Sequence, residues 1–149
     1  MSRQRTILVG YDGLDAADRA LARAMDEARA GGAKLVVLAV SEMPLNPEGP
    51  QNFGTLDDSP ATMIPLTEPP ELASVLGRAQ ERVEAAGLQA DYVWAAGEPA
   101  QEIVVAARER GADIVVVGHH HHGLMGRLFG EDVAAGVKRA ADCEVIAVD

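Results

Sequence analysis

Short apolar runs alternate with segments of helical periodicity along most of the chain, and this alternation restricts the fold more than any other feature. The runs are rich in Val, Ile and Leu, which is typical of buried strands. They lie at Thr6–Gly10, Lys34–Val40, Ala90–Ala96, Asp113–Gly118 and Glu144–Val148. Apolar residues at helical spacing predict helices over Ala16–Ala30, with Asp15 as its N-cap, over Leu72–Ala86, from Pro99 to near Gly111, and over Val133–Ala141. Strands that alternate with helices imply right-handed crossovers and a parallel sheet covered on both faces.

Composition narrows the class of protein further. The 149 residues are 48% hydrophobic, which predicts one folded domain over residues 1–149. A net charge of −10 argues against binding to nucleic acid or anionic membranes, because phosphates attract clusters of Lys and Arg. No apolar run approaches the roughly 20 residues of a membrane span, and the N-terminus lacks a signal-peptide pattern. The single cysteine, Cys143, is compatible with a reducing compartment. We therefore expect a cytoplasmic protein. Cys143 itself precedes an apolar run, and we expect it to be a small core residue.

The segment 41–70 departs from the alternating pattern. It holds seven of the eight prolines and shows no periodicity over most of its length. A loop of such length is functional or is an insertion tolerated at the surface. The sequence leaves both interpretations open.

A glycine-punctuated passage, Gly118–Gly130, follows the fourth predicted strand and precedes the last predicted helix. Such strand–loop–helix passages bind phosphates in α/β proteins, because backbone N–H groups converge on the anion. In parallel sheets, ligands bind at the carboxyl ends of strands where the strand order reverses. We therefore expect a crevice between the first and fourth strands, with Gly10–Gly13 on one side and this passage on the other.

Three stretches carry a resemblance to a known family: ILVGYDGLDAADRAL, GEPAQEIVVAARERGADIVVVG, and GRLFG followed by VAAGVKRAADCEVIAVD. Together they resemble the universal stress protein family over the whole chain except 41–70. The resemblance implies a flavodoxin-like (adenine nucleotide alpha hydrolase-like) α/β fold with a five-stranded parallel sheet in the order 3-2-1-4-5. It also implies a homodimer formed through the last strand, and a regulatory stress-response module that is at most a weak ATPase. Many members of the family bind ATP through the pattern G-x-x-G, nine residues, then G-[ST].

The resemblance and the residue types of the loop together predict a set of nucleotide contacts: Gly10, Tyr11, Asp12, Val40, Val117, Gly118, His120, His121, Arg127, Gly130, Glu131, Asp132 and Val133. The ATP pattern is incomplete. Gly118 fits the first glycine, but His121 replaces the second glycine, and the spacer His122–Phe129 is one residue short. Glu131 replaces the Ser or Thr. A carboxylate at a helix N-terminus satisfies the N–H groups that a phosphate would use, and it repels a triphosphate. We therefore predict that ATP binding is weakened or lost.

The sequence also supports alternatives at this loop. Arg127 and the histidines could hold ATP or a cyclic nucleotide in place of glycine N–H groups. A divalent metal could bind to His119, His120, His121 and His122 with the help of Glu131 and Asp132, or the histidines form a solvated surface. Asp12 either contacts a ligand or caps the segment that follows it. A last alternative is an interaction protein that recruits a partner through residues 41–70. No Ser-His-Asp set or paired carboxylates have the spacing of a hydrolase.

Overall fold

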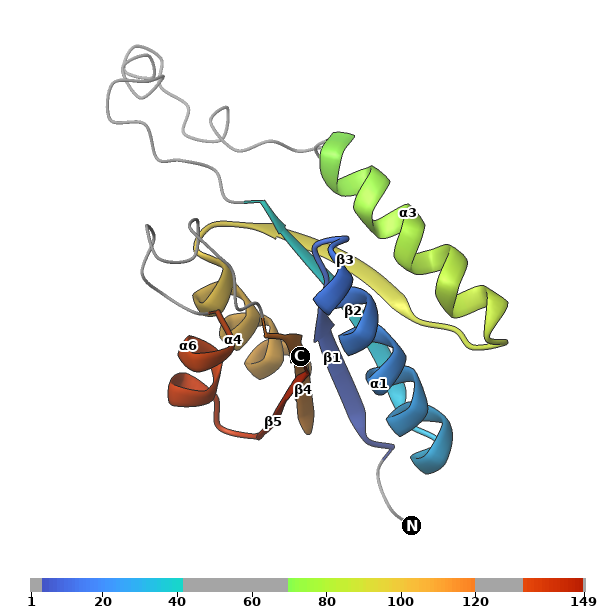
Figure 1. The fold of residues 1–149 in the computed structure, drawn as a ribbon. Coiled ribbons are helices and arrows are strands. Elements are labelled where there is room, and N and C mark those ends of the chain that lie inside the picture. The colour runs from blue at the N-terminus through green and yellow to red at the C-terminus, as the bar shows by residue number, and fades with distance from the viewer. Residues whose placement is uncertain (1–3, 42–69, 120–132, 149) are drawn as a thin grey trace, which may run out of the picture.

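The computed structural model describes residues 4–41, 70–119 and 133–148, which form one five-stranded parallel sheet with helices on both faces (Figure 1). The strand order is β3-β2-β1-β4-β5, which confirms the predicted order 3-2-1-4-5. The elements in chain order are β1 (Thr6–Gly10), α1 (Asp15–Gly31), β2 (Lys34–Ser41), α3 (Pro70–Ala85), β3 (Asp91–Ala96), α4 (Pro99–Arg110), β4 (Ile114–Gly118), α6 (Val133–Ala140) and β5 (Glu144–Val148).

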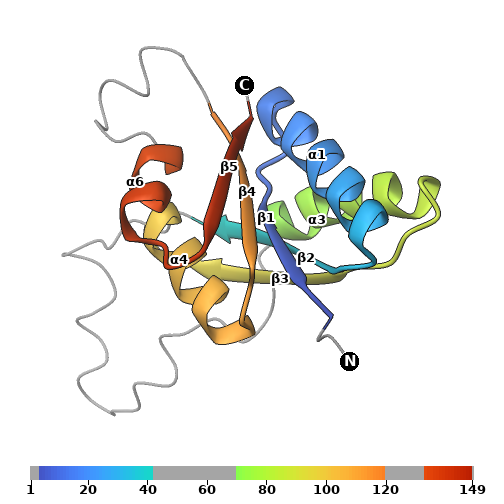
Figure 2. The same cartoon turned by 90° about the horizontal axis from the view of Figure 1, so that it is seen from below.

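The helices form two layers on opposite faces of the sheet. Helices α1 and α3 cover one face, and α4 and α6 cover the other (Figure 2). Successive side chains of a strand point to opposite faces, so Ile7 and Val9 of β1 pack under α1 and α3, whereas Leu8 packs under α4 and α6. The hydrophobic core is therefore divided into two clusters by the sheet.

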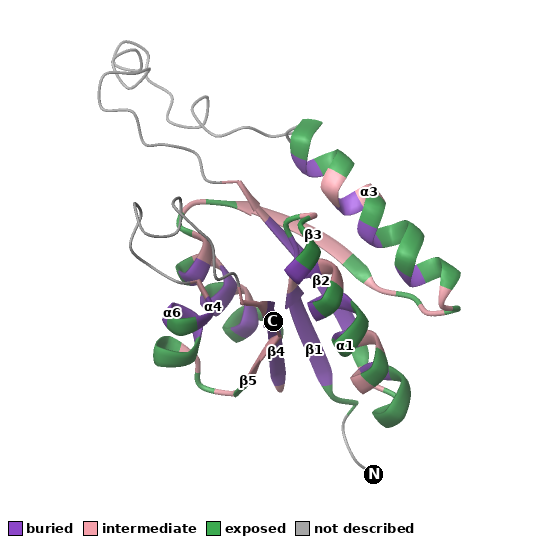
Figure 3. Cartoon of the chain, in the orientation of Figure 1, coloured by how far each residue is buried: buried purple, intermediate pink, exposed green. Residues whose placement is uncertain are grey.

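Burial decreases from the centre of the sheet to its edges. Strands β1, β2 and β4 are mostly buried, whereas β3 and β5 are mostly half-buried (Figure 3). This agrees with the continuous apolar runs of the central strands, because a strand covered by helices on both faces has no polar side to alternate with.

The ends of two helices show which local signals were interpreted correctly. Helix α4 has Pro99 in its first turn, and its N-cap Glu98 accepts a hydrogen bond from the Gln101 N–H at 2.9 Å, which is a common way to begin a helix. The predicted cap of α1 was wrong. Asp15 is the first residue of the helix, and Leu14 is the N-cap without any side-chain hydrogen bond.

Candidate functional site

A crevice opens at the carboxyl ends of β1, β2 and β4, where the strand order reverses as the sequence predicted. It has a volume of about 110 Å³. Its walls are mainly apolar and come from both helix layers. The lining residues are Gly10, Tyr11, Asp12, Ala17, Leu38, Val40, Pro99, Ile103, Val117, Gly118 and Val133.

Two glycines let backbone and helices meet at the base of this crevice. A Cβ at Gly118 would lie 2.8 Å from both the carbonyl carbon and the oxygen of Ala16, at the start of α1. A Cβ at Gly10 would lie 3.0 Å from Cδ1 of Ile103 on α4. Contacts within the protein thus explain the glycine at Gly118, before any ligand is considered, whereas at Gly10 a shift of the Ile103 side chain could make room for a Cβ.

Asp12 is the one charged side chain among the described residues that line the crevice. Its Oδ1 accepts a hydrogen bond from the Leu14 N–H at 2.9 Å, across Gly13, whose φ is +83°. This is an Asx-type turn, in which a short carboxylate mimics a backbone carbonyl. Both roles weighed for Asp12 from the sequence are therefore compatible: it orders the turn before α1, and it lines the crevice.

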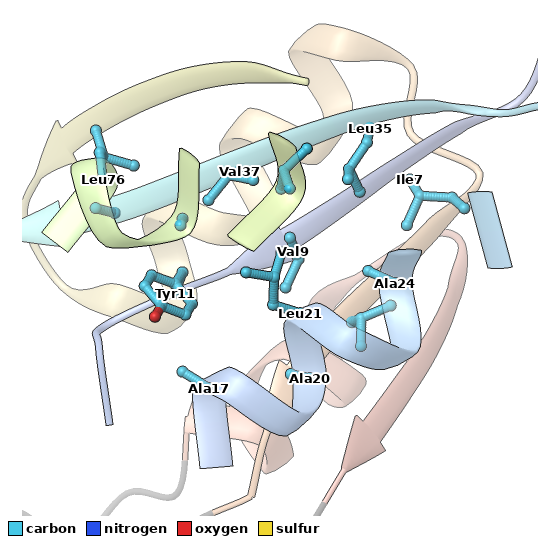
Figure 4. Close-up of a cluster of buried hydrophobic side chains, with 14 of the residues drawn as sticks. Ile7, Val9, Tyr11, Ala17, Ala20, Leu21, Ala24, Leu35, Val37 and Leu76 are labelled. Carbon is cyan, nitrogen blue, oxygen red and sulfur yellow. The ribbon is translucent and has the colours of Figure 1, made fainter. Parts of the chain in front are cut away.

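The side chain of Tyr11 belongs to the buried core between α1 and α3 (Figure 4). Its hydroxyl donates a hydrogen bond to Oδ1 of Asp18 at 2.5 Å. The pKa of Tyr11 is raised to about 12, first by burial and then by the hydrogen bond and negative charge of Asp18, while Arg78 and Arg82 lower it by less. Tyr11 thus lines the crevice while its hydroxyl is held by α1.

The predicted contacts fall into two groups. The first group lies around the crevice and consists of Gly10, Tyr11, Asp12, Val40, Val117, Gly118 and Val133. The other predicted contacts lie outside the described residues: His120, His121, Arg127, Gly130, Glu131 and Asp132.

The predicted metal site also falls mostly outside the described residues, since His119 alone of its histidines is described. The His119 N–H donates a hydrogen bond to the Val148 carbonyl at 2.7 Å, which continues the pairing of β4 with β5. Residues 4–41, 70–119 and 133–148 contain no group of three or more His, Cys, Asp or Glu side chains that could hold a metal ion.

Sequence reasoning missed four apolar residues of the crevice, Ala17, Leu38, Pro99 and Ile103. One signal could have found Leu38, because it lies two residues before Val40 and so on the same face of β2. Ile103 is an apolar residue of α4, and the sequence does not show whether such a side chain faces the core or the crevice.

Cys143 lies away from the crevice, just before β5. It is half-buried and packs against the cluster under α4 and α6, in line with the predicted role as a small apolar residue. Burial, followed by the charges of Asp113, Asp142 and Glu144, raises the pKa of the Cys143 thiol. The thiol is therefore a poor nucleophile at neutral pH, because the thiolate is the reactive form.

This geometry defines the chain as an α/β protein with a parallel sheet and a crevice where the strand order reverses. None of the described helices is long and apolar enough to cross a membrane. The sequence matches the universal stress protein family over residues 4–149.

Similar proteins agree with this match. The chain is 33% identical to a universal stress protein of Thermus aquaticus, with 97% of this chain and 98% of the relative covered. It is 30% identical to the universal stress protein YxiE of Bacillus subtilis, with 95% of this chain and 97% of the relative covered. Among solved structures, a universal stress protein crystallised in complex with cAMP is 29% identical in sequence and superimposes with a TM-score of 0.72. The match covers 99% of this chain and 98% of the chain in that crystal structure. This chain belongs to the universal stress protein family.

Proposed function

We propose that this protein is a regulatory module of the stress response whose crevice binds an adenine nucleotide, with an affinity for ATP lower than the complete family pattern would give. The observation that carries the proposal is the crevice itself, which combines apolar walls with bare backbone at Gly10 and Gly118 and with the Asp12 carboxylate. Apolar walls with a few polar groups are typical of small-molecule sites. The similar protein solved in complex with cAMP supports a nucleotide as the class of ligand.

The charge of the site supports weak binding of a triphosphate. The described lining contains a carboxylate and no basic side chain, and the whole chain has a net charge of −10. Tight binding of polyphosphate needs a local positive potential that opposes this charge. In the sequence, Arg127 is the one permanent cation of the glycine-rich passage, and Glu131 and Asp132 follow it closely. The walls therefore suit a base and ribose better than a chain of phosphates.

Calorimetry with Mg-ATP and with cAMP at neutral pH tests this proposal. We expect affinity for Mg-ATP weaker than low-micromolar, and a gain of up to about fivefold in the Glu131→Ser variant, because a carboxylate two residues before α6 in the sequence would compete with phosphate for the helix N-terminus. Glu144→Ser is the matched control, since it removes the same charge at the start of β5, at the end of the sheet remote from the crevice. Low-micromolar binding of Mg-ATP to the unchanged protein, or an equal gain in both variants, would contradict the prediction.

We also propose that two copies of the chain associate through β5. This strand forms one edge of the sheet, and its apolar residues Val145–Val148 are only half-buried. An edge strand presents unpaired N–H and C=O groups that pair readily with another strand. The carbonyl of Val148 is directed to β4, so the backbone groups of the preceding residue, Ala147, are directed outward.

Light scattering at micromolar concentration tests the dimer. We expect twice the chain mass for the unchanged protein and a monomer for Ala147→Pro, because proline removes one outward N–H without breaking the β4–β5 pairing. Ala96→Pro, on the opposite edge strand β3, is the control and is expected to remain dimeric. A monomeric unchanged protein would refute the proposed association.

The composition supports the remaining parts of the proposal. With a net charge of −10, the partners are small molecules and a second copy of the chain rather than nucleic acid or a membrane surface. A single cysteine is compatible with a place in the reducing cytoplasm.

A further inference from the structure

The turn after β1 is held by a residue that does not line the crevice. The guanidinium Nη1 of Arg78, on α3, donates a hydrogen bond to the Gly13 carbonyl at 3.0 Å. A Cβ at Gly13 would lie 3.5 Å from that Nη1 atom and 3.7 Å from Cγ2 of Val75, so the turn lies directly against α3. Gly13 is the residue that the Asp12–Leu14 hydrogen bond encloses. Arg78 therefore contacts the backbone at the centre of the turn that orients Asp12.

The same arginine also belongs to an ionic cluster that connects α3 to α1. Arg78 Nη2 lies 3.7 Å from Oδ2 of Asp18, and Arg82 Nη2 lies 3.2 Å from the same oxygen. Asp18 is only 16% exposed and also accepts the Tyr11 hydroxyl hydrogen bond. One carboxylate on α1 thus aligns two arginines on α3. Among the described residues, Arg78 also donates a hydrogen bond to the turn, whereas Arg82 bonds to Asp18.

We propose that Arg78 is a positioning residue for the crevice: by fixing the Gly13 carbonyl it holds the Asp12 carboxylate in place, and so it sets the affinity for the bound nucleotide. This inference rests on the proposed nucleotide binding and goes beyond it, because Arg78 is outside the crevice lining. Without Arg78, the turn must be ordered when the ligand binds. The entropic cost of fixing the backbone of one residue corresponds to about five- to thirtyfold in affinity.

Arg78 and Arg82 form a matched pair for testing this. Their side chains are 52% and 48% exposed, and both contact Asp18. Exposed ion pairs of this kind contribute little to global stability, so neither alanine variant is expected to unfold. We expect Arg78→Ala to weaken cAMP binding at least fivefold in calorimetry, and Arg82→Ala to leave it within twofold. Arg78→Lys keeps one donor and should recover part of the loss.

A double-mutant cycle shows whether Arg78 acts through Asp12. In the Asp12→Asn background, Arg78→Ala should cause no further loss of cAMP affinity, since the group that it positions has already been altered. Equal losses in the Arg78→Ala and Arg82→Ala variants, or fully additive losses with Asp12→Asn, would overturn the proposal.

Amide hydrogen exchange in the ligand-free protein gives a second measurement that needs no ligand. The Leu14 amide is protected by Asp12 within the turn, so Arg78→Ala should accelerate its exchange, while Arg82→Ala should not. If cAMP does not bind to the unchanged protein, the proposed function fails, and Leu14 exchange still decides whether Arg78 holds the turn. Unchanged Leu14 exchange in Arg78→Ala would refute the positioning role.

Discussion

The Gly118→Ala variant is expected to lose about 2–4 kcal/mol of unfolding free energy, a large effect for the addition of one methyl group. The new Cβ would lie 2.8 Å from the carbonyl carbon and oxygen of Ala16 and 3.0 Å from its Cβ. These atoms belong to the first turn of α1 and cannot rotate away as a flexible side chain could. The loss is therefore steric, and it should displace α1 from β4.

Urea denaturation of the two proteins measures this loss, with Gly77→Ala as the control. Gly77 lies within α3, and a Cβ there meets nothing within 4 Å. Alanine at that position should stabilise the protein by up to about 1 kcal/mol, because glycine is a poor helix former. A Gly118→Ala variant as stable as the unchanged protein would show that α1 yields easily, and that Gly118 is present for another reason, such as the approach of a ligand.

The second large effect is expected at alkaline pH and comes from Tyr11. Its pKa is raised to about 12 in the folded protein, compared with about 10 in an unfolded chain. The folded state therefore holds this proton more tightly than the unfolded state. Below pH 10 both states keep the proton; as the pH rises from 10 to 12 the unfolded chain loses it first, and the free energy of unfolding falls. A two-unit difference corresponds to about 3 kcal/mol.

Comparison with Tyr11→Phe isolates this contribution from the titration of lysines, which is common to both proteins. The ring remains packed, while the hydroxyl hydrogen bond to Asp18 is lost, so we expect a cost of about 1 kcal/mol at neutral pH. Between pH 10 and 12 the free energy of unfolding should fall less steeply in the variant. Tyr92→Phe is a useful comparison, because burial and then Glu84 raise the pKa of Tyr92 as well. Parallel pH profiles for Tyr11→Phe and the unchanged protein would contradict the assignment.

The elements of the fold were largely predictable because the local signals agree with the tertiary structure. Strands β1 and β5 begin and end as predicted, and the other element bounds agree within two residues. Each strand is a compact apolar run that ends at, or is followed by, a glycine or a polar residue, which leaves little freedom in its placement. The start of α1 was misassigned since Asp12, rather than Asp15, provides the carboxylate that accepts a backbone hydrogen bond there.

The site was less predictable, because its order depends on contacts between residues far apart in the chain. Asp12 and Gly118 could be placed at the crevice from their positions after strands. Nothing in the sequence indicates that Arg78 contacts Gly13, 65 residues earlier. The partner of the Tyr11 hydroxyl was equally hidden, since Asp18 on the first turn of α1 could have faced solvent.

The division of the core by the sheet has a consequence for what a ligand would do mechanically. The cluster under α1 and α3 and the cluster under α4 and α6 have no residue in common. At the crevice, Tyr11 and Ala17 of the first cluster lie beside Ile103 and Val117 of the second. A molecule bound there would touch both at once and act as a non-covalent crosslink between the two helix layers.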